Sequence, residues 1–199
     1  PHGIGAVRIK RHVVDAEAPM ITIRDETPDD YEHVRRVTID AFTNSQLGHT
    51  GEADLIETLR RNGGVYLSLV ACRDREIVGH ILFTPVLIRT AQVALRGMGL
   101  GPVSVTPTLQ RTGIGSSLVT TGCTRLFANA CPFVVVLGRP EFYSRFGFDR
   151  ASRHRIQHGF TGIPQHMFSI RMGPDGTLEH LREGVVYYCR EFGVQHIDT

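Results

Sequence analysis

The sequence predicts a single α/β domain built on a mixed sheet, and three observations support this. A chain of 199 residues suits one well-packed domain and is short for two. The composition, 41% hydrophobic and 21% charged, is that of a globular protein and argues against disorder. Along the chain, one strand-like segment and two helical segments precede several strands, and a strand–helix–strand unit follows.

The first half of the chain predicts a strand, two helices and a hairpin. Residues 21–24 alternate as in a strand, and the apolar spacing that starts at Tyr31 is typical of an amphipathic helix. Residues 52–59 predict a second helix, which the following Asn-Gly-Gly ends. Two apolar runs, 65–72 and 77–88, predict a hairpin.

The second half adds a strand–helix–strand unit and a tail of short strands. We expect an extended stretch at 93–105, a helix at 113–130, a strand buried on both faces at 133–137, a brief helix at 140–145, and strands at 167–172 and 185–189. We further expect residues 1–19 to be an N-terminal extension, flexible or added for expression, because a strand-like run directly follows Met20. Residues 20–155 would form the core, and residues 156–199 a C-terminal appendage packed on the same domain.

The composition excludes several classes of function. Lys10 is the only lysine, so the folded body cannot supply the amine of a pyridoxal Schiff base or of an NTPase phosphate loop. A net charge of +2 gives no support to binding nucleic acid or an acidic membrane. The longest aliphatic or aromatic run, Phe133 to Leu137, is far shorter than a membrane span.

Four cysteines without clustered spacing indicate reduced thiols and a cytoplasmic protein (Cys72, Cys123, Cys131 and Cys189).

The most informative motif runs from a predicted strand into a predicted helix. The strand residues 103–105 end at Pro107, and Gln-Arg-Thr-Gly-Ile-Gly-Ser follows at 110–116. The first turn of a helix has unpaired backbone N–H groups and a partial positive charge, and glycines allow a phosphate to approach closely. This pattern predicts a diphosphate cradle. Alternatively, Gly113 and Gly115 only permit tight helix–sheet packing. The dinucleotide-binding fingerprint fits poorly, because Leu118 stands where its third glycine should be.

A second motif, Glu-Phe-Tyr-Ser-Arg-Phe-Gly-Phe at 141–148, follows the buried strand. Tyr143 comes after the next strand of the same sheet, so its phenol can point toward whatever the cradle holds and donate a proton to a departing thiolate. The alternative is that Tyr143 is one more ring of an aromatic cluster with Phe142, Phe146 and Phe148.

Together the two motifs resemble the GNAT superfamily of N-acetyltransferases over about residues 20–150. Residues 110–115 match the family's Q/R-x-x-G-x-G/A acetyl-CoA signature, and residues 142–148 match its F-Y-x-x-x-G-F segment. Residues 138–140 and 162–168 are further similar to a bacterial subgroup of N-acetyltransferases. The resemblance implies a GNAT-like α/β fold: a mixed, mostly antiparallel central sheet flanked by helices, with a small C-terminal strand and turn appendage.

The resemblance also implies an activity: transfer of an acetyl group from acetyl-CoA to an unidentified primary amine of a small molecule or peptide. The amine attacks the thioester directly, Val105 N–H polarises the carbonyl, and Tyr143 protonates the leaving CoA thiolate. The residues implied to hold acetyl-CoA are Val103, Val105, Gln110, Arg111, Thr112, Gly113, Ile114, Gly115 and Ser116.

The sequence departs from the family at two places. Many members carry an asparagine seven residues before the tyrosine, where Val136 stands here, and many have a glutamate as general base near the strand at 103–105, which has none. Candidates for the base are Glu52, Glu57 and His80, which the sequence does not rank. Two alternatives stay open: a non-catalytic domain that binds acyl-CoA as a sensor or structural partner, and a nucleotide-dependent oxidoreductase.

The sequence contains three weaker candidate sites. His154 and His158 have the spacing of two zinc ligands on one helical face, but no third ligand is evident, and we predict no metal site. Arg139 and Arg145 flank the tyrosine and can meet a CoA phosphate. The basic residues 8–12 are too short a nucleic-acid arm, and a homodimer through late strands is a hypothesis only.

Overall fold

The computed structural model describes residues 20–43, 51–174 and 183–193. The strands of these residues are β1 (Ile21–Asp25), β2 (Leu67–Arg73), β3 (Glu76–Arg89), β4 (Ala94–Val105), β5 (Phe133–Leu137), β6 (Asp149–Arg150), β7 (Ile156–His158), β8 (Phe168–Met172) and β9 (Gly184–Tyr187). The α-helices are α1 (Tyr31–Thr43), α2 (Glu52–Arg61), α3 (Ile114–Ala128) and α4 (Pro140–Tyr143).

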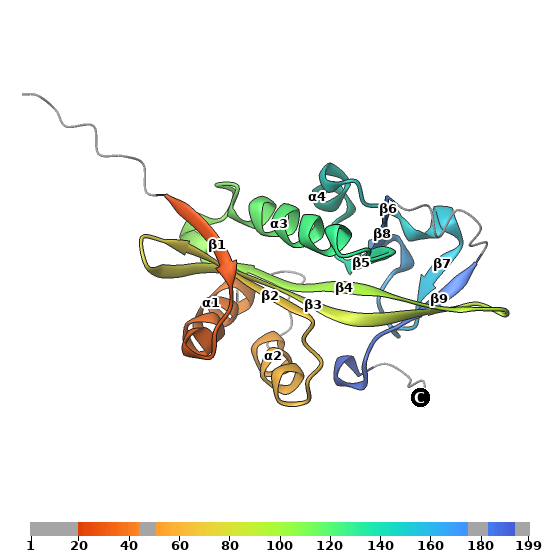
Figure 1. Cartoon of the computed structure of the whole chain (residues 1–199), viewed down its shortest axis with the longest axis horizontal. Helices are drawn as coiled ribbons and strands as arrows, with labels where there is room; N and C mark the ends of the chain where they lie inside the picture. The colour runs from red at the N-terminus through yellow and green to blue at the C-terminus, as the bar shows by residue number, and fades with distance from the viewer. Residues whose placement is uncertain (1–19, 44–50, 175–182, 194–199) are drawn as a thin grey trace, which may run out of the picture.

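The described strands form one sheet in the order β1-β2-β3-β4-β5-β8-β6, and β9 pairs with both β3 and β7. Every pair is antiparallel except β4–β5 and β7–β9. This confirms the predicted mixed, mostly antiparallel sheet. The late strands β7, β8 and β9 belong to the same sheet as the rest (Figure 1).

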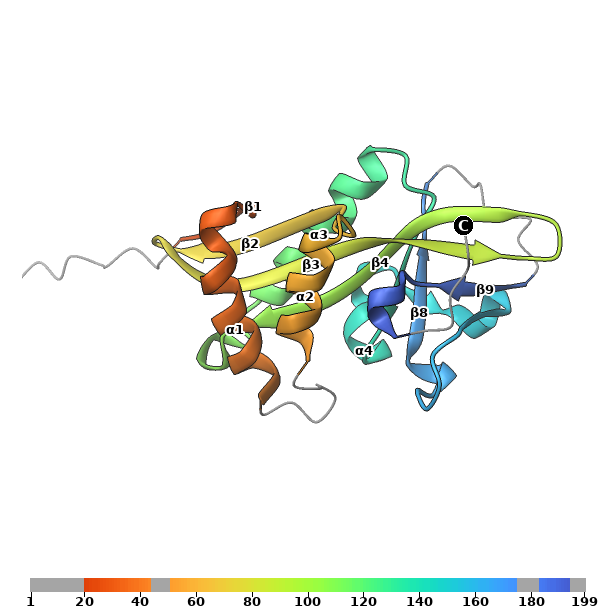
Figure 2. The same ribbon diagram turned by 90° about the horizontal axis from the view of Figure 1, so that it is seen from below.

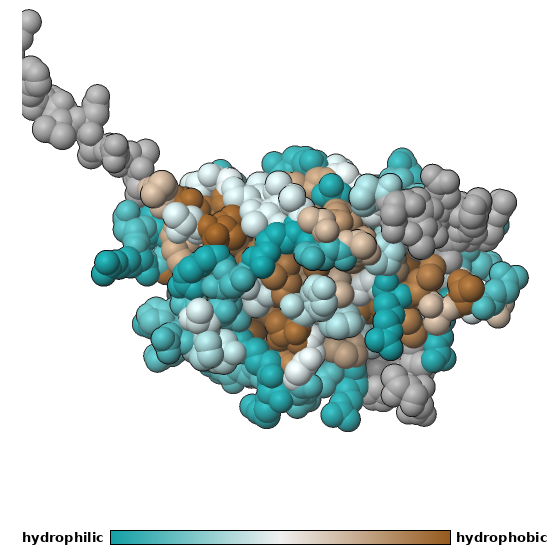
Figure 3. Space-filling model, viewed as in Figure 1, coloured by the Kyte–Doolittle hydropathy of each residue, from teal (hydrophilic) through white to brown (hydrophobic). Residues whose placement is uncertain are grey.

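Helices cover both faces of the sheet. Helices α1 and α2 lie on one face and α3 and α4 on the other (Figure 1), and the view from below shows α1 and α2 side by side across β2 and β3 (Figure 2). On the α3 face, Phe83 and Leu118 are fully buried, and on the α1 face Val34 packs against Val70. Seen along the sheet, hydrophobic residues gather between the helix layers while hydrophilic ones cover the outer surfaces (Figure 3). None of the helices among the described residues is long and apolar enough to cross a membrane.

Most element boundaries agree with those expected from the sequence. The buried strand occupies Phe133–Leu137 as expected, and the long helix begins after Gly113, whose φ is +98°. The brief helix ends at Tyr143 and continues as a 3-10 turn to Phe146, where Gly147 takes φ +79°. These positive φ values explain why glycine stands at both positions.

The spacing of the two histidines does not correspond to a helix in the structure. His154 ends a 3-10 turn (Ala151–His154) and His158 ends β7, with Arg155 between them at φ +54°. The two imidazoles therefore do not share a helical face, because the left-handed residue breaks the helical spacing.

The feature that shapes the site is the divergence of β4 from β5. Strand β5 pairs with β4 only at Met98–Leu100. The register to β3 then shifts: Phe83 pairs with Leu100 and Ile81 with Val103, so β4 carries an extra residue in a bulge. Bulges bend the strand that contains them and increase its twist. Beyond the bulge, the residues 103–105 stay paired with β3, and no described strand occupies their other edge.

Candidate active site

A cavity of about 540 Å³ opens where β4 and β5 diverge. Its walls come from β4, the loop before α3, the first turn of α3, and the segment of α4. The residues that line it are Val103, Val105, Gln110, Arg111, Gly113, Gly115, Ser116, Phe142, Tyr143 and Arg145. Both sequence motifs thus meet at one cavity, although about 30 residues separate them in the chain.

Two residues of the predicted binding set do not line this cavity. Thr112 donates its side-chain hydroxyl to the Leu109 carbonyl at 2.6 Å, and Ile114 is 4% exposed and belongs to the core under α3. The side chain of Ile114 is therefore unavailable to a ligand, whereas Thr112 is exposed but lies outside the lining. Phe142 lines the cavity, and the sequence assigned it to aromatic packing alone. Its position beside Tyr143 in the sequence is the signal that could have predicted Phe142 as a lining residue.

The glycines distinguish a cradle from a packing contact. A Cβ at Gly113 would meet no atom within 4 Å, and one at Gly115 would lie 3.6 Å from Val105 Cγ2, an ordinary contact. On the same helix, a Cβ at Gly122 would lie 2.4 Å from the Phe83 ring. Gly122 is therefore the glycine that close packing requires. The space above Gly113 and Gly115 belongs to the cavity.

The start of α3 is suited to an anion. Arg111 and Gly113 both have positive φ, +64° and +98°, and successive backbone N–H groups in such a loop form an anion-binding concavity. The Ser117 N–H donates to the Gly113 carbonyl at 2.9 Å, so the N–H groups of the helix's first turn precede the first intrahelical bond. Among the lining residues are two arginines, Arg111 and Arg145, and no acid. The helix dipole adds to the positive potential.

The open edge of β4 offers backbone groups to an extended ligand. The Thr106 N–H donates to the Val78 carbonyl at 2.9 Å, which places the 106/78 pair in hydrogen-bonding register. Because directions alternate along a strand, the N–H and C=O groups of Val103 and Val105 face the open edge. The Val105 carbonyl accepts a bond from Gln110 Nε2 at 3.2 Å. The N–H groups of Val103 and Val105 are left facing the cavity.

Tyr143 is a buried tyrosine that lines this cavity. It is 9% exposed and packs edge-on against Phe142 and Phe148, with ring centroids 5.0 and 5.7 Å apart. The predicted aromatic cluster is therefore real, and Tyr143 belongs to both the cluster and the cavity. Burial, with a smaller effect from Cys123, raises the pKa of Tyr143 above its usual value, so the phenol stays protonated. Gly138 makes room for the ring, since a Cβ there would lie 2.5 Å from Tyr143 Cε2.

The two flanking arginines differ. Arg145 lines the cavity, lies over the Phe142 ring at 4.8 Å, and donates through Nε to the Phe142 carbonyl at 3.3 Å. Arg139 precedes α4 and is not among the residues that line the cavity. Of the two candidates for a CoA phosphate, only Arg145 is positioned by the cavity wall.

None of the three candidate bases lines the cavity. His80 is fully buried in β3, where burial and then nearby Arg60 lower its pKa to about 3, so it stays neutral at physiological pH. Glu57 forms an exposed ion pair with Arg35 at 2.8 Å. Glu52 lies in the first turn of α2. Within the described parts of the chain, no group of three or more His, Cys, Asp or Glu side chains is arranged to hold a metal ion.

A mixed sheet with a diverging strand pair, an anion cradle at a helix start and a buried phenol is the arrangement of an acyl-CoA-dependent transferase. Comparison with known proteins agrees. The family profile described as "Acetyltransferase (GNAT) domain" matches residues 22–151. The uncharacterized N-acetyltransferase YhbS of Escherichia coli K12 is 31% identical over 155 residues, which cover 77% of this chain and 90% of the relative. The uncharacterized N-acetyltransferase YjhQ of the same organism is 34% identical over 161 residues, covering 77% and 86%.

Solved structures give the same result. A GNAT family acetyltransferase from Brucella melitensis, in complex with acetyl-CoA, matches with a TM-score of 0.71 and 33% identity, covering 88% of this chain and 99% of that one. The structure of Escherichia coli YhbS in complex with CoA matches with a TM-score of 0.76 and 29% identity, covering 90% and 96%. The chain belongs to the GNAT acetyltransferase family. This confirms the predicted fold, the class of enzyme, an N-acyltransferase, and acetyl-CoA as its donor.

Proposed function

We propose that the protein transfers the acetyl group of acetyl-CoA to a primary amine by direct attack on the thioester, with Tyr143 as general acid. The observation that carries this proposal is the meeting of three features in one cavity: the anion cradle at α3, the open edge of β4 and the buried phenol. The two known acetyltransferase structures that contain acetyl-CoA or CoA support the nature of the ligand.

The cradle and the strand edge account for donor binding. The CoA diphosphate lies on the backbone N–H groups between Arg111 and Ser116, where the dipole and two arginines favour negative charge. The pantetheine arm extends along the free edge of β4 and pairs with the backbone of Val103 and Val105, in the place that a strand would take. The thioester then reaches the N–H of Val105.

The chemical step needs one proton removed and one donated. The amine nitrogen attacks the carbonyl carbon, and the Val105 N–H stabilises the oxyanion that forms. When the C–S bond breaks, the sulfur leaves as a thiolate and takes the phenol proton of Tyr143, which later regains one from water. A carboxylate, histidine or water chain removes the proton of the amine.

Burial raises the pKa of both groups in this proton transfer, the Tyr143 phenol and the CoA thiol. A phenol with a raised pKa is a weak acid, but the thiolate leaves into the same desolvated region. The neighbouring thiol of Cys123 illustrates the effect, because burial raises its pKa to about 11. A CoA thiolate released there is likewise a stronger base than in water, which favours transfer of the proton from the phenol.

Tyr143→Phe tests the proposal, because it removes the proton donor and keeps the ring. We expect kcat to fall about 10²- to 10⁴-fold, the usual contribution of a general acid, with the acetyl-CoA Kd unchanged. Free CoA thiol released with a panel of primary amines reports turnover, and calorimetry reports binding, with NAD and ATP as negative controls. Unchanged turnover in the variant would refute the role of Tyr143. Binding of acetyl-CoA without turnover on any amine would favour the non-catalytic alternative.

Three expectations stay predictions: a cytoplasmic location, a homodimer, and a small-molecule or peptide amine as the acceptor. The four cysteines lie in described residues, are free, and three of them are buried, which agrees with the expected reduced thiols.

A further inference from the structure

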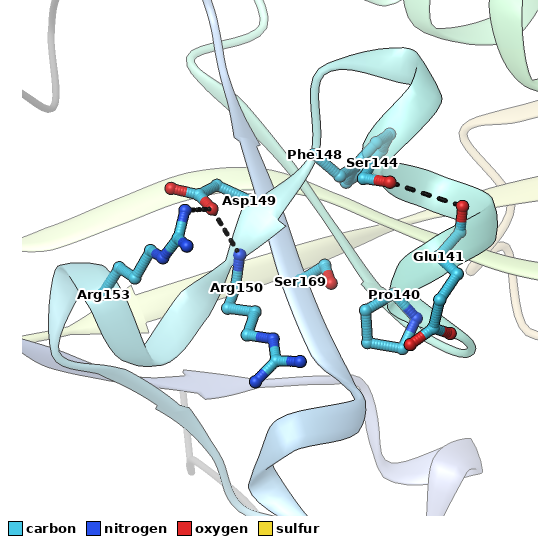
Figure 4. A pocket seen from close by; sticks show the side chains of 8 residues that line it. All are labelled: Pro140, Glu141, Ser144, Phe148, Asp149, Arg150, Arg153 and Ser169. Carbon is cyan, nitrogen blue, oxygen red and sulfur yellow. Dashed lines mark hydrogen bonds and ion pairs between the residues drawn. The ribbon is translucent and has the colours of Figure 1, made fainter.

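A second cavity, of about 230 Å³, lies behind α4 (Figure 4). It is lined by Pro140, Glu141, Ser144, Phe148, Asp149, Arg150, Arg153 and Ser169 and shares no lining residue with the first cavity. Its walls are α4 with the following turn on one side and β6 with its following turn on the other, and β8 forms the floor. Its volume corresponds to about eight water molecules in the liquid, at roughly 30 Å³ each.

The segment of α4 separates the two cavities. Pro140, Glu141 and Ser144 face the second cavity, whereas residues 142, 143 and 145 face the first. A ligand in the second cavity therefore contacts the same short segment that carries Tyr143.

The floor of the second cavity carries a polar group that the fold does not use. Ser169 is 2% exposed, and its hydroxyl makes no hydrogen bond with any residue that the structure describes. It points into the cavity, between the residues of the two walls (Figure 4). The hydroxyl is not among the fully enclosed polar atoms of the described residues that lack a partner, so it is open to the cavity and free to bond a molecule there.

The charged groups at the rim are of both signs. Arg153 is held by Asp149, with Nη1 2.7 Å from Oδ1. By contrast, the side chains of Arg150 and Glu141 form no ion pair within the described residues, and their charged ends lie on opposite sides of the space (Figure 4). Within the part of the chain that the structure describes, the cavity thus offers an unpaired cation, an unpaired anion and the Ser169 hydroxyl, beside the side chains of Pro140 and Phe148.

We propose that this second cavity binds a small amino carboxylate, such as a free amino acid, as an effector. The carboxylate pairs with the Arg150 guanidinium and accepts a hydrogen bond from the Ser169 hydroxyl, and the ammonium group pairs with Glu141. The side chain of the ligand lies against Pro140 and Phe148. Because α4 forms one wall, a bound effector fixes the segment that positions Tyr143 and changes kcat, a consequence that rests on the proposed function.

Binding is tested on the whole protein by thermal unfolding and calorimetry with each of the twenty common amino acids. Acetate and ethylammonium serve as half-ligands. For at least one amino acid we expect a midpoint rise of roughly 3–5 °C at ten times its Kd, and much weaker effects of both half-ligands. Arg150→Gln and Glu141→Gln are each expected to weaken binding at least tenfold, and Ser169→Ala severalfold. The control is Arg75→Gln, a substitution in the turn between β2 and β3, which should change nothing.

Two further measurements identify the cavity that is occupied. Titration in saturating acetyl-CoA should leave the amino acid bound, and mass spectrometry after incubation should recover it unmodified. The proposal would be overturned if the amino acid competed with acetyl-CoA. It would also be overturned if the amino acid were acetylated and bound Arg150→Gln as tightly as the wild type, because it would then occupy the reaction site. Absence of binding by every amino acid at millimolar concentration would overturn it equally. Since these are binding measurements, they stand apart from any failure of the Tyr143→Phe test.

Discussion

Replacing Gly115 with leucine is expected to remove acetyl-CoA binding while leaving the fold intact. The position is in the first turn of α3, and a Cβ there lies 3.6 Å from Val105 Cγ2 and 3.8 Å from Phe142 Cζ, both ordinary contacts. The remaining carbons of a leucine must then project into the cavity, over the backbone that the diphosphate would contact. We expect the Kd for acetyl-CoA to rise at least tenfold, which corresponds to about 1.4 kcal/mol.

Two alanine variants make the result decisive. Gly115→Ala adds only the tolerated Cβ, so donor binding should persist. Its better helix propensity should stabilise the free protein by up to about 1 kcal/mol, or roughly 2–4 °C. Gly122→Ala on the same helix places a Cβ 2.4 Å from the Phe83 ring and should cost about 1–3 kcal/mol without a selective loss of binding.

Isothermal titration with acetyl-CoA and thermal unfolding of the free proteins separate the two effects. The cradle reasoning is refuted if Gly115→Leu binds acetyl-CoA as tightly as the wild type. It also fails if Gly115→Ala destabilises the protein as Gly122→Ala does, because Gly115 would then be a packing glycine.

Three further predictions follow from other residues. His80, whose folded pKa is lowered to about 3, takes up its proton only on unfolding; stability should therefore fall as the pH drops below about 6.5, by at most about 1.4 kcal/mol per pH unit. Urea unfolding at pH 7 and pH 5 measures this loss, and an unchanged pH dependence in His80→Asn would contradict it. Gly138→Ala places a Cβ 2.5 Å from the Tyr143 ring and should lower kcat with a smaller effect on the acetyl-CoA Kd; steady-state kinetics with unchanged kcat would count against this positioning. Arg145→Ala should weaken acetyl-CoA binding severalfold and reduce its salt dependence, whereas Arg139→Ala, outside the cavity wall, should not; equal effects in calorimetry would remove the distinction.

The sequence predicted the fold well because its signals were local. Gly113 and Gly147 sit where positive φ ends or begins a helix, and the run Phe133–Leu137 is hydrophobic at every position because both faces are covered. The i, i+4 spacing of His154 and His158 carried no such local signal: it would place the two side chains on one face only in a continuous helix, and Arg155 between them is left-handed.

The cradle and Tyr143 could be predicted because each lies in a local motif that directly follows a predicted strand. Residues 110–116 form one loop and one helix start, so their local pattern carries the cradle. The second cavity unites α4, β6 and Ser169 of β8, which are brought together only by strand pairing across the sheet. The general base could not be predicted for the same reason. Glu52 and Glu57 belong to α2 and His80 to β3, and only the folded structure shows that none of the three lines the cavity.

The unpaired edge of β4 has a consequence for the protein when it lacks its donor. An exposed strand edge is a template on which another chain can add a strand, and natural proteins normally cover or interrupt such edges. Here the proposed cover is the pantetheine arm, a small molecule whose supply varies with metabolism. Bound acetyl-CoA would thus prevent self-association through this edge, in addition to donating the acetyl group. When acetyl-CoA is depleted, more of the protein would have this edge exposed.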